Sequence, residues 1–305
     1  MSVWVLEDPR TGTAAQSLGI AERLGVPFRR IPLRFGPWAK VVWPWGTLAG
    51  LADRSEFAPP WPDLVISSGR RAAPVSRWLR ARGARTVHTM RPGFGAGDFD
   101  LLVIGSLDSP APADNLMVIQ GAAHRLTPEA LAAAPAAFPE LATLPSPRVT
   151  LILGGPVRSE NMAPEVAARI ARDAACLGAS VMATTSRRTG VTAADAVANS
   201  LSDTPHHLHR WGAPGQNPYL AMLALADILV VTGDSTSMLS EALMTTAPLL
   251  IADPGGLGPR HRAMVGQLVE AGLAARLGSA LPPPRAALDE MRRIVAEIRA
   301  RGLIR

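Results

Sequence analysis

The chain contains almost no cysteine, lysine or tyrosine. Its 305 residues include one cysteine and one tyrosine, and the only lysine is Lys40. A single cysteine excludes a disulfide within the chain, and the Ala-rich surroundings of Cys176 predict a small buried core residue. This composition fits the reducing cytoplasm.

Long apolar runs are also missing. No run approaches the roughly 18 residues that a membrane-spanning helix needs. The first residues, Met1–Asp8, have neither the basic region nor the long apolar stretch of a secretory signal, and they are typical of a β-strand instead. We therefore expect a soluble, cytoplasmic protein.

Positive charge comes almost entirely from arginine. The 31 basic and 25 acidic residues give a net charge of +6. Because arginine pairs well with phosphate and carboxylate groups, anionic partners are one interpretation, and the coding bias of a GC-rich genome is the other. No basic stripe with interleaved aromatic residues occurs, so we expect no nucleic-acid partner.

Short runs of Val, Ile and Leu alternate with longer Ala-, Leu- and Arg-rich stretches of helical period. This alternation is typical of parallel strands covered by helices. The expected strands are Val3–Glu7, Leu64–Ser67, Arg85–Met90, Leu101–Ile104, Leu116–Ile119, Val149–Leu153, Ser180–Thr184, His206–His209, Ile228–Val231 and Leu249–Ile251. The expected helices are Ala14–Leu24, Ala72–Arg82, Ala163–Leu177, Ala193–Ser202, Pro218–Ala224, Ser237–Met244, Arg260–Ala271 and Arg285–Arg301.

The length suits two domains, and Leu144-Pro145-Ser146-Pro147 is typical of a linker between them. We predict an α/β fold of two Rossmann-like, doubly wound domains that face a cleft. They cover residues 1–144 and 148–284, and a C-terminal helix lies within residues 285–305. In such sheets ligands bind beyond the carboxyl ends of the strands, so the cleft is the expected site.

The clearest candidate site is the turn Thr232–Ser237, between a buried strand and a helix. Gly233 permits tight geometry, and hydroxyl and N–H groups gather where the helix begins, which favours a diphosphate. Further along this helix, Glu241 could accept hydrogen bonds from a ribose. The alternative is an ordinary helix cap by Asp234 or Ser235, and Asp234 would repel phosphate unless it turns away. The candidate binding residues are Gly233, Asp234, Ser235, Thr236, Ser237 and Glu241.

Two more strands of the second half end in turns of this kind. Gly154 and Gly155 would let the backbone approach a ligand closely, and Arg158 could clamp a negative charge. The other turn, Thr184–Thr189, supplies hydroxyl groups and the guanidinium groups of Arg187 and Arg188, and its candidate binding residues are Thr185, Ser186 and Arg187. Solvated loops are the alternative, but three such turns at the strand ends of one domain favour a common site.

The first half has two comparable turns. Asp8 follows the first strand and could act as a general base, or could only cap the next helix. Ser68 and Gly69 form the turn after another strand, where Arg70 or Arg71 could meet an anionic ligand across the cleft.

Trp38, Trp43 and Trp45 lie in a segment with four basic residues. Aromatic and basic side chains together suit an anionic membrane surface or a lipid-linked acceptor, which would place the protein at the periphery of the inner membrane. The alternative is packing inside the first domain. The histidines, including adjacent His206 and His207, have no acidic partner at ligand spacing, so we predict no metal site and no cofactor.

Several motifs follow one another in the order of a known family. They are Asp8…Gly12…Gln16, residues 62–75, Leu153-Gly154-Gly155-Pro156, residues 184–189, Asn217-Pro218-Tyr219-Leu220 and residues 231–242. Together they resemble the bacterial members of the elongated-mitochondria family, whose plant members act in mitochondrial fission. The resemblance spans nearly the whole chain. One departure is Ala15, where the family usually has an asparagine.

The resemblance implies a GT-B fold, like that of the glycosyltransferase that adds N-acetylglucosamine to the lipid-linked peptidoglycan precursor. In such enzymes a Gly/Ser turn of the C-terminal domain holds a nucleotide diphosphate and a helix glutamate binds ribose, which Ser235–Ser237 and Glu241 would match. Gly12 and Gln16 join the candidate substrate-binding residues, and Asp8 or His88 would be the base. The C-terminal helix would cross back to the first domain.

Two functions follow from these observations. The first is metal-independent transfer of a sugar from a nucleotide diphosphate sugar to a cell-envelope or lipid-linked acceptor. The second is a non-catalytic scaffold that recruits a protein partner or a membrane, as fission in plants requires. A bacterium has no mitochondria, so the fission role itself does not carry over.

Overall fold

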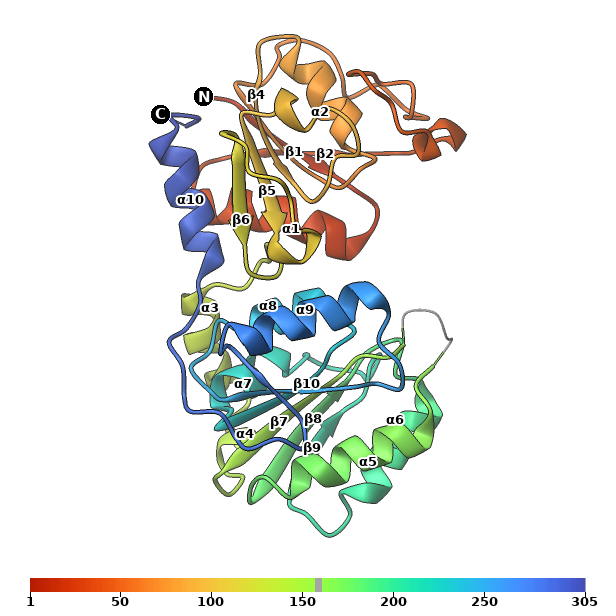
Figure 1. Cartoon of the computed structure of the whole chain (residues 1–305), viewed down its shortest axis with the longest axis vertical. Helices are drawn as coiled ribbons and strands as arrows, with labels where there is room; N and C mark the ends of the chain where they lie inside the picture. The colour runs from red at the N-terminus through yellow and green to blue at the C-terminus, as the bar shows by residue number, and fades with distance from the viewer. Residues whose placement is uncertain (157–160, 305) are drawn as a thin grey trace. The chain divides into compact units, whose positions relative to one another are not determined.

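The computed structural model describes residues 1–156 and 161–304, and it divides into two compact units (Figure 1). The first unit comprises Met1–Arg125 and Asp289–Arg305, and the second comprises Leu126–Leu288. The division falls after Arg125, whereas the sequence analysis placed it after residue 144. The reason is that the short helices α3 (Pro128–Ala133) and α4 (Pro139–Ala142) pack against a helix of the second unit.

The first unit is built on a parallel sheet of six strands in the order β2-β1-β3-β4-β5-β6. The strands are β1 (Val3–Glu7), β2 (Arg29–Pro32), β3 (Leu64–Ser68), β4 (Arg85–Thr89), β5 (Leu101–Gly105) and β6 (Leu116–Ile119). The helices are α1 (Thr11–Leu24), α2 (Ala73–Arg80) and α10 (Glu290–Ala300), with short 3-10 turns η1 (Pro37–Lys40), η2 (Ala96–Asp98) and η3 (Ser106–Asp108).

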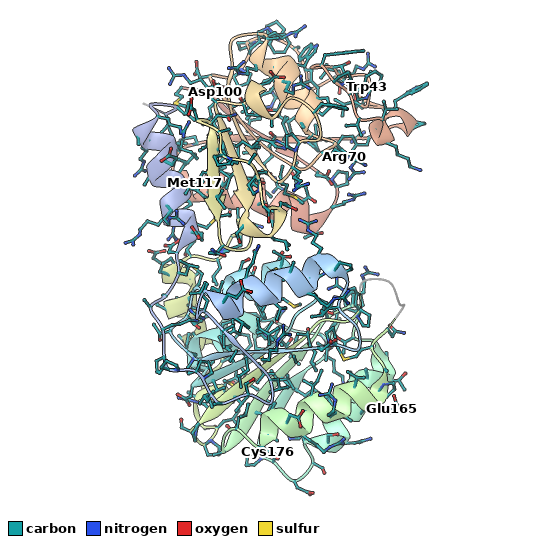
Figure 2. The ribbon with its side chains drawn as sticks, in the orientation of Figure 1. Trp43, Arg70, Asp100, Met117, Glu165 and Cys176 are labelled. Carbon is teal, nitrogen blue, oxygen red and sulfur yellow. The ribbon has the colours of Figure 1, made fainter. Side chains whose placement is uncertain are left out.

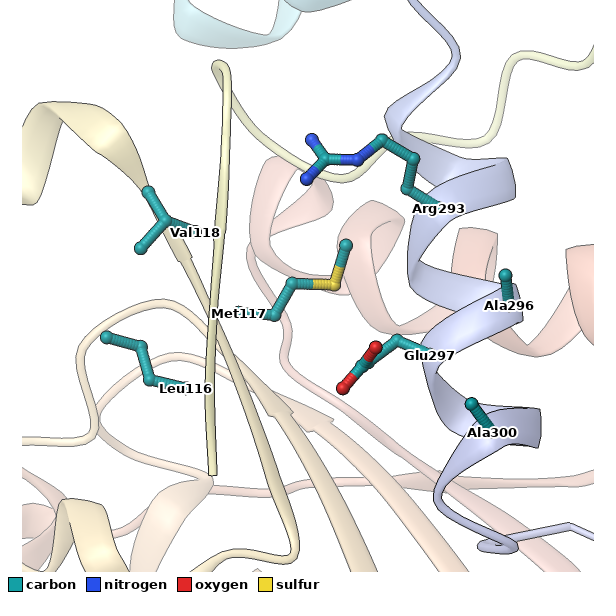
Figure 3. Close-up of a pocket in the computed structure, with 7 residues that line it drawn as sticks. All are labelled: Leu116, Met117, Val118, Arg293, Ala296, Glu297 and Ala300. Atoms are coloured by element: carbon teal, nitrogen blue, oxygen red, sulfur yellow. The ribbon is translucent and has the colours of Figure 1, made fainter. Parts of the chain in front are cut away.

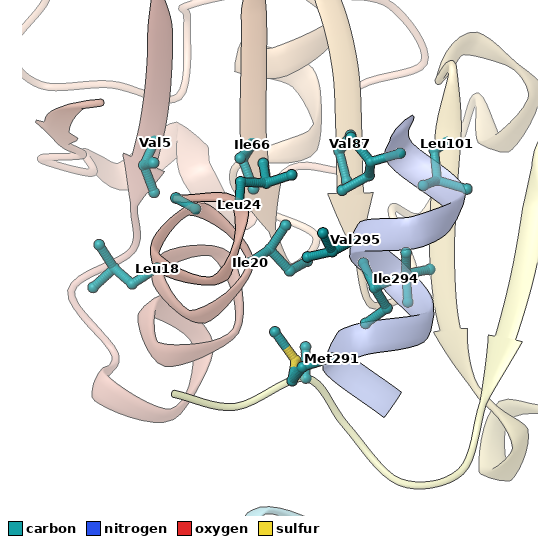
Figure 4. Packing of buried hydrophobic residues seen from close by; sticks show 14 of the residues in the cluster. Val5, Leu18, Ile20, Leu24, Ile66, Val87, Leu101, Met291, Ile294 and Val295 are labelled. Atoms are coloured by element: carbon teal, nitrogen blue, oxygen red, sulfur yellow. The ribbon is translucent and has the colours of Figure 1, made fainter. Parts of the chain in front are cut away.

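Helices α1 and α10 pack together on one face of this sheet (Figure 4). Met291, Ile294, Val295 and Ile298 recur at helical spacing in α10, and all four are buried against the strands and α1. The other face is covered by α2, whose Leu79 lies in a second apolar cluster. The last helix of the chain therefore completes the core of the first unit.

The second unit has a parallel six-stranded sheet of its own, in the order β12-β11-β10-β7-β8-β9. The strands are β7 (Arg148–Leu153), β8 (Ser180–Thr185), β9 (His206–His209), β10 (Ile228–Thr232), β11 (Leu249–Ala252) and β12 (Ala275–Arg276). The helices besides α3 and α4 are α5 (Pro164–Ala175), α6 (Val191–Ser200), α7 (Tyr219–Leu225), α8 (Thr236–Ala242) and α9 (Pro259–Glu270), with one 3-10 turn, η4 (Ala134–Ala137).

The central strands of the second sheet are buried on both faces. In β7, Leu151 packs with α5 and α6, while Met182 of β8 packs with α7 and α4 on the opposite side. Such two-sided burial explains the continuous apolar runs of the sequence. The predicted fold class is confirmed, because each unit is a doubly wound parallel sheet.

Three local expectations were wrong. Cys176, expected in the core, is exposed just after α5. The edge strands β2 and β12 were missed. The C-terminal helix begins at Glu290 instead of Arg285, because the Arg285 guanidinium donates to the carbonyl oxygens of the last turn of α8. In the parts of the chain that the structure describes, none of the helices combines the length and apolar character needed to cross a bilayer.

Candidate functional site

Three turns meet at the carboxyl edge of the second sheet, where β7, β8 and β10 end. Because all strands are parallel, their carboxyl ends lie along one edge. The backbone N–H of Gly154, after β7, donates to Thr232 Oγ1 at 2.7 Å, and that of Gly155 donates to Asp234 Oδ2 at 3.0 Å. The turn after β7 is thus fixed to the turn after β10.

Arg188, in the turn after β8, connects these two turns to the third. Its Nη2 lies 2.5 Å from Asp234 Oδ2, and its Nε donates to the carbonyl oxygen of Gly155 at 3.1 Å. Thr189 Oγ1 lies 2.6 Å from the carbonyl oxygen of Gly154 and also bonds that of Leu153. One side chain, Arg188, therefore holds all three turns together.

The two glycines are required by this packing. A side-chain carbon at Gly154 would lie 2.3 Å from Asp234 Oδ2, and one at Gly155 would lie 2.2 Å from the carbonyl oxygen of Arg188. Asp234 itself is 3% exposed, and its second oxygen, Oδ1, is buried with no hydrogen-bond donor among the described residues. Asp234 turns toward Arg188 and leaves the helix cap to Ser235, whose Oγ accepts from the N–H of Met238 at 3.4 Å.

Glu241 lies further along α8 and is held by the only tyrosine of the chain. The Tyr219 hydroxyl donates to Glu241 Oε2 at 2.6 Å. Burial raises the pKa of Glu241, and the hydrogen bond from Tyr219 partly offsets this. The pKa of Tyr219 is raised well above its usual value, first by burial and then by the charge of Glu241. The carboxylate is thus oriented before any ligand binds.

The remaining predicted residues of this half lie around the same edge. Thr185 ends β8 and its Oγ1 accepts from the N–H of Trp211, while Ser186 Oγ accepts from the N–H of Arg188. Thr236 and Ser237 are half-buried in the first turn of α8, and Gly233 is packed against Leu257 and Val265. Arg187 is exposed and makes no hydrogen bond or ion pair with another described residue. Arg158 lies outside the described residues.

At the carboxyl edge of the first sheet, Asp8 is held by Arg71. The Arg71 guanidinium bonds both carboxylate oxygens, at 2.6 and 3.3 Å, and stacks on Phe35 at 4.4 Å from the ring centroid. Asp8 Oδ1 also accepts from the N–H of Arg10 at the start of α1. Asp8 is 3% exposed. This observation bears on both predicted roles of Asp8, general base and helix cap. Its carboxylate orders the start of α1, and it is already paired with Arg71.

Gln16 and Ser68 meet through Thr89, whose hydroxyl lies 3.1 Å from Gln16 Oε1 and 2.8 Å from Ser68 Oγ. Gly69 has a φ of +80°, in the region that favours glycine, and it packs against Thr13 of α1. The structure brings these residues together. Gly12 and Arg70 are exposed at the same edge, and Arg70 has no hydrogen bond or ion pair with another described residue (Figure 2).

His88 lies inside the first sheet, on β4. Its side chain is fully buried, stacks on Phe99 at 4.7 Å between centroids, and shares a 2.7 Å hydrogen bond between Nδ1 and Ser67 Oγ. Burial lowers the pKa of His88 to about 3. The imidazole is therefore neutral at pH 7 and a weak base, and a substrate hydroxyl would not reach it without opening the sheet.

The tryptophan segment lies on the surface of the first unit. Trp38 is 64% and Trp45 59% exposed, and the Trp43 and Trp45 rings lie 6.0 Å apart. Arg77 of α2 fixes this segment, because it donates to the carbonyl oxygens of Trp43 and Pro44. Packing inside the core therefore does not account for Trp38 and Trp45.

A comparison with protein families gives a match along residues 11–302 to the model described as mitochondrial fission ELM1. The chain belongs to this family. It is 31% identical over 146 residues to the mitochondrial fission protein ELM1 of Arabidopsis thaliana, a match that covers 46% of this chain but only 34% of the plant protein. It is 24% identical over 323 residues to the uncharacterized protein RP120 of Rickettsia prowazekii, covering 90% of both chains.

Solved structures with the same architecture are GT-B glycosyltransferases and related proteins. MurG of Acinetobacter baumannii has a TM-score of 0.54 and 13% identity, covering 99% of this chain and 92% of its own. The calicheamicin glycosyltransferase CalG4 has a TM-score of 0.53 and 13% identity, covering 100% and 92%. The UDP-GlcNAc 2-epimerase of Neisseria meningitidis, bound to UDP-GlcNAc, has a TM-score of 0.51 and 13% identity, covering 98% and 91%. At these identities the likeness establishes the GT-B-like fold alone.

Two cavities of the first unit are lined by residues other than the predicted site residues. A groove of about 490 Å³ runs between β6 and α10, lined by Leu116, Met117, Val118, Arg293, Ala296, Glu297 and Ala300 (Figure 3). Another, of about 470 Å³, lies near Trp4, Phe28 and Glu56. Residues 1–156 and 161–304 contain no cluster of three or more His, Cys, Asp or Glu side chains placed to hold a metal ion. The candidate site therefore rests on the joined turns.

Sequence reasoning missed the residues that organise these sites. Arg188 was expected in the turn but only Arg187 was taken as a binding residue, Arg71 was expected to meet an anionic ligand instead of Asp8, and Thr89 was not assigned a role. A signal existed for an arginine partner, because a buried carboxylate such as that of Asp234 needs a positive group beside it, but this signal does not distinguish Arg188 from Arg187. For Thr89, at the end of a strand, nothing in the sequence marked a contact with Gln16.

Proposed function

We propose that this chain binds a nucleoside diphosphate sugar at the carboxyl edge of its second sheet and transfers the sugar to an acceptor. The observation that carries the proposal is the contact of Arg188 with both Gly155 and Asp234, which joins three strand-end turns into one preformed edge. Preformed backbone turns suit a diphosphate because little ordering remains to be done on binding. The UDP-GlcNAc named in the epimerase structure is a ligand of this chemical class.

Each predicted residue has a part in this binding. The turn at Gly154 and Gly155 and the hydroxyls of Ser235–Ser237 would surround the diphosphate, with Thr185 and Ser186 beside them. The exposed Arg187 guanidinium is available to a phosphate. Glu241, oriented by Tyr219, would accept hydrogen bonds from the ribose hydroxyls. Asp234 faces Arg188, so its charge is balanced.

The proposed reaction is attack of an acceptor oxygen on the anomeric carbon of the sugar, with the nucleoside diphosphate as leaving group. Backbone N–H groups and arginines would stabilise the developing charge of the diphosphate without a metal ion. In the first unit His88 is unsuited to accept the acceptor proton, because it is fully buried and its pKa of about 3 makes it weakly basic, so the proposed base is Asp8 once it is released from Arg71. The acceptor that we favour is a cell-envelope or lipid-linked molecule.

A thermal-shift panel tests this proposal. UDP-, GDP-, ADP- and TDP-sugars would be added separately to the wild-type chain and to Glu241→Ala. We expect one nucleotide class to raise the Tm of the wild type and to do so less in the variant, because a ribose contact is lost. If none of these nucleotide sugars raises the Tm of the wild-type chain, the proposal is wrong. Incubation with the stabilising sugar nucleotide and release of the free nucleoside diphosphate would then separate transfer or hydrolysis from binding alone.

A second candidate function is a non-catalytic scaffold that recruits a membrane or a protein partner. The observation that favours it is that Trp38, Val41 and Trp45, which lie close to Lys40 in the sequence, are exposed in the first unit. Apolar aromatic and basic side chains together bind anionic lipid surfaces. Co-sedimentation with vesicles that contain anionic lipid should fall when Trp38, Trp43 and Trp45 are replaced by serine. Equal sedimentation of both proteins would contradict it.

A further inference from the structure

Asp234 is an unusual residue for a turn that binds a diphosphate. A carboxylate beside a phosphate group raises the cost of bringing the two together. Yet Asp234 is almost completely buried at the edge, with its side chain only 1% exposed, and its Oδ1 has no hydrogen-bond donor among the described residues. The chain therefore keeps a buried negative charge where the proposed ligand is also negative.

Arg188 balances this charge at close range. The 2.5 Å contact between Arg188 Nη2 and Asp234 Oδ2 is a charge-assisted hydrogen bond, and the Arg188 side chain is 35% exposed. The pair is therefore reached by solvent from the Arg188 side only. At the position of a ligand a few ångströms away, the electrostatic potentials of the two opposite charges largely cancel.

The charges of this pair also affect the pKa of a neighbouring side chain, His261. His261, in the first turn of α9, is half-buried, and burial is the main cause of its lowered pKa. The charge of Asp234 raises that pKa, while the charges of Arg260 and Arg188 lower it. Changing either member of the pair would therefore change the electrostatic potential beyond the pair itself.

We propose that the Arg188–Asp234 pair sets the charge of the nucleotide site and thereby determines how strongly the site holds a diphosphate. The inference rests on the proposed function and assigns a role to two residues within it. Asp234 is a positioning residue that fixes Gly155 and Arg188. Because its two charges oppose each other, the pair limits the affinity of the site for the anion, so that a leaving diphosphate can be released.

The proposal predicts opposite signs for the two single substitutions. Arg188→Gln leaves the carboxylate unbalanced, so binding of UDP and of inorganic pyrophosphate should weaken at least about tenfold, which is about 1.4 kcal/mol. Asp234→Asn keeps an oxygen that accepts from Gly155 N–H and releases the guanidinium charge, so both anions should bind more tightly. The double variant restores neutrality and should bind within a few-fold of the wild type. Uridine, which is uncharged, should bind all four proteins alike.

Isothermal titration of the full chain with UDP, pyrophosphate and uridine makes this measurement. Arg188→Lys, which keeps the charge, should retain UDP binding and guards against a folding defect in Arg188→Gln. The matched control is the exposed pair of Arg169 and Asp173 on α5, where the same Gln and Asn substitutions should leave UDP affinity unchanged.

Three results would overturn the inference while the proposed function stands. They are UDP binding unaffected by Arg188→Gln, weaker binding in Asp234→Asn, or a double variant no better than Arg188→Gln. A parallel loss of uridine binding would also contradict it, because a collapsed pocket loses neutral and charged ligands alike. If the wild-type chain binds neither UDP, the other nucleoside diphosphates nor pyrophosphate, the proposed function fails together with this inference.

Discussion

Tyr219 donates its phenol hydrogen to Glu241 Oε2 over 2.6 Å, and burial raises the pKa of both side chains. The two residues come from different helices, α7 and α8, that flank β10. A carboxylate held in this way keeps one geometry without a ligand. Its burial also couples the stability of the second unit to pH.

The Glu241 carboxylate should make the chain less stable as pH rises. Its folded-state pKa is raised above the usual 4.5, so the protonated form is favoured in the fold, and the associated stability is present below that value and is lost as pH rises through the folded pKa. Glu241→Gln removes this titration and keeps an acceptor for Tyr219. We expect the variant to gain stability relative to the wild type between pH 4.5 and pH 7.

Urea denaturation at several pH values measures this difference. Tyr219→Phe provides the complementary change, because it removes the hydrogen bond that lowers the pKa of Glu241. The pH dependence should then become steeper. An identical pH dependence in the wild type and Glu241→Gln would show that Glu241 titrates normally.

Removing Arg71 should destabilise the first unit strongly. The substitution Arg71→Ala leaves the Asp8 carboxylate, 3% exposed, without its bidentate partner, and we expect a loss of about 3 kcal/mol in the free energy of unfolding. Arg71→Lys keeps the charge but not the two parallel hydrogen bonds and should lose less. As a control, Arg125→Gln breaks the more exposed pair with Glu22 and should cost at most about 1 kcal/mol. Equal costs at both pairs would show that burial of Asp8 contributes nothing.

The architecture could be predicted from the sequence because a strand that is buried on both faces consists of a continuous run of apolar residues. β7 and β10 are such strands, and their position at the centre of the sheet follows. β2 was not predicted because it is an edge strand of four residues, three of which are exposed and one of which is a proline. Its arginines were interpreted together with the neighbouring tryptophans instead.

The site was predictable at the level of turns but not of side-chain partners. Parallel strands bring their carboxyl ends to one edge, so turns at residues 154, 186 and 233 had to be neighbours. Which of two adjacent arginines faces inward depends on the turn conformation, which has no period in the sequence. Arg188 therefore could not be separated from Arg187 by pattern. Cys176 was wrongly expected in the core. It caps the C-terminal end of α5, where the helical pattern of buried residues has ended.

His88 should make the first unit sensitive to acid. Its folded-state pKa of about 3 lies below the usual 6.5, so its contribution to stability is present above 6.5 and is lost as pH falls toward the folded value. In that range each pH unit costs about 1.4 kcal/mol for one proton. His88→Asn keeps a hydrogen-bonding group near Ser67 and removes the titration, so its stability should fall less between pH 6 and pH 4. Unchanged acid sensitivity would contradict the burial argument, and unchanged nucleotide binding is expected because the ring lies inside the sheet.

Gly155→Ala should damage both stability and nucleotide binding. The added methyl group would lie 2.2 Å from the carbonyl oxygen of Arg188, a backbone atom that moves only with its turn, so we expect a loss of about 2–3 kcal/mol. The control is Gly266→Ala in α9, where no atom lies within 4 Å of the added carbon and alanine should stabilise the helix by up to about 1 kcal/mol. Thermal unfolding and UDP titration of both variants make the comparison. If Gly155→Ala loses stability but binds UDP as tightly as the wild type, the turn after β7 does not contact the diphosphate, and the ligand must be held by the turn after β10 alone.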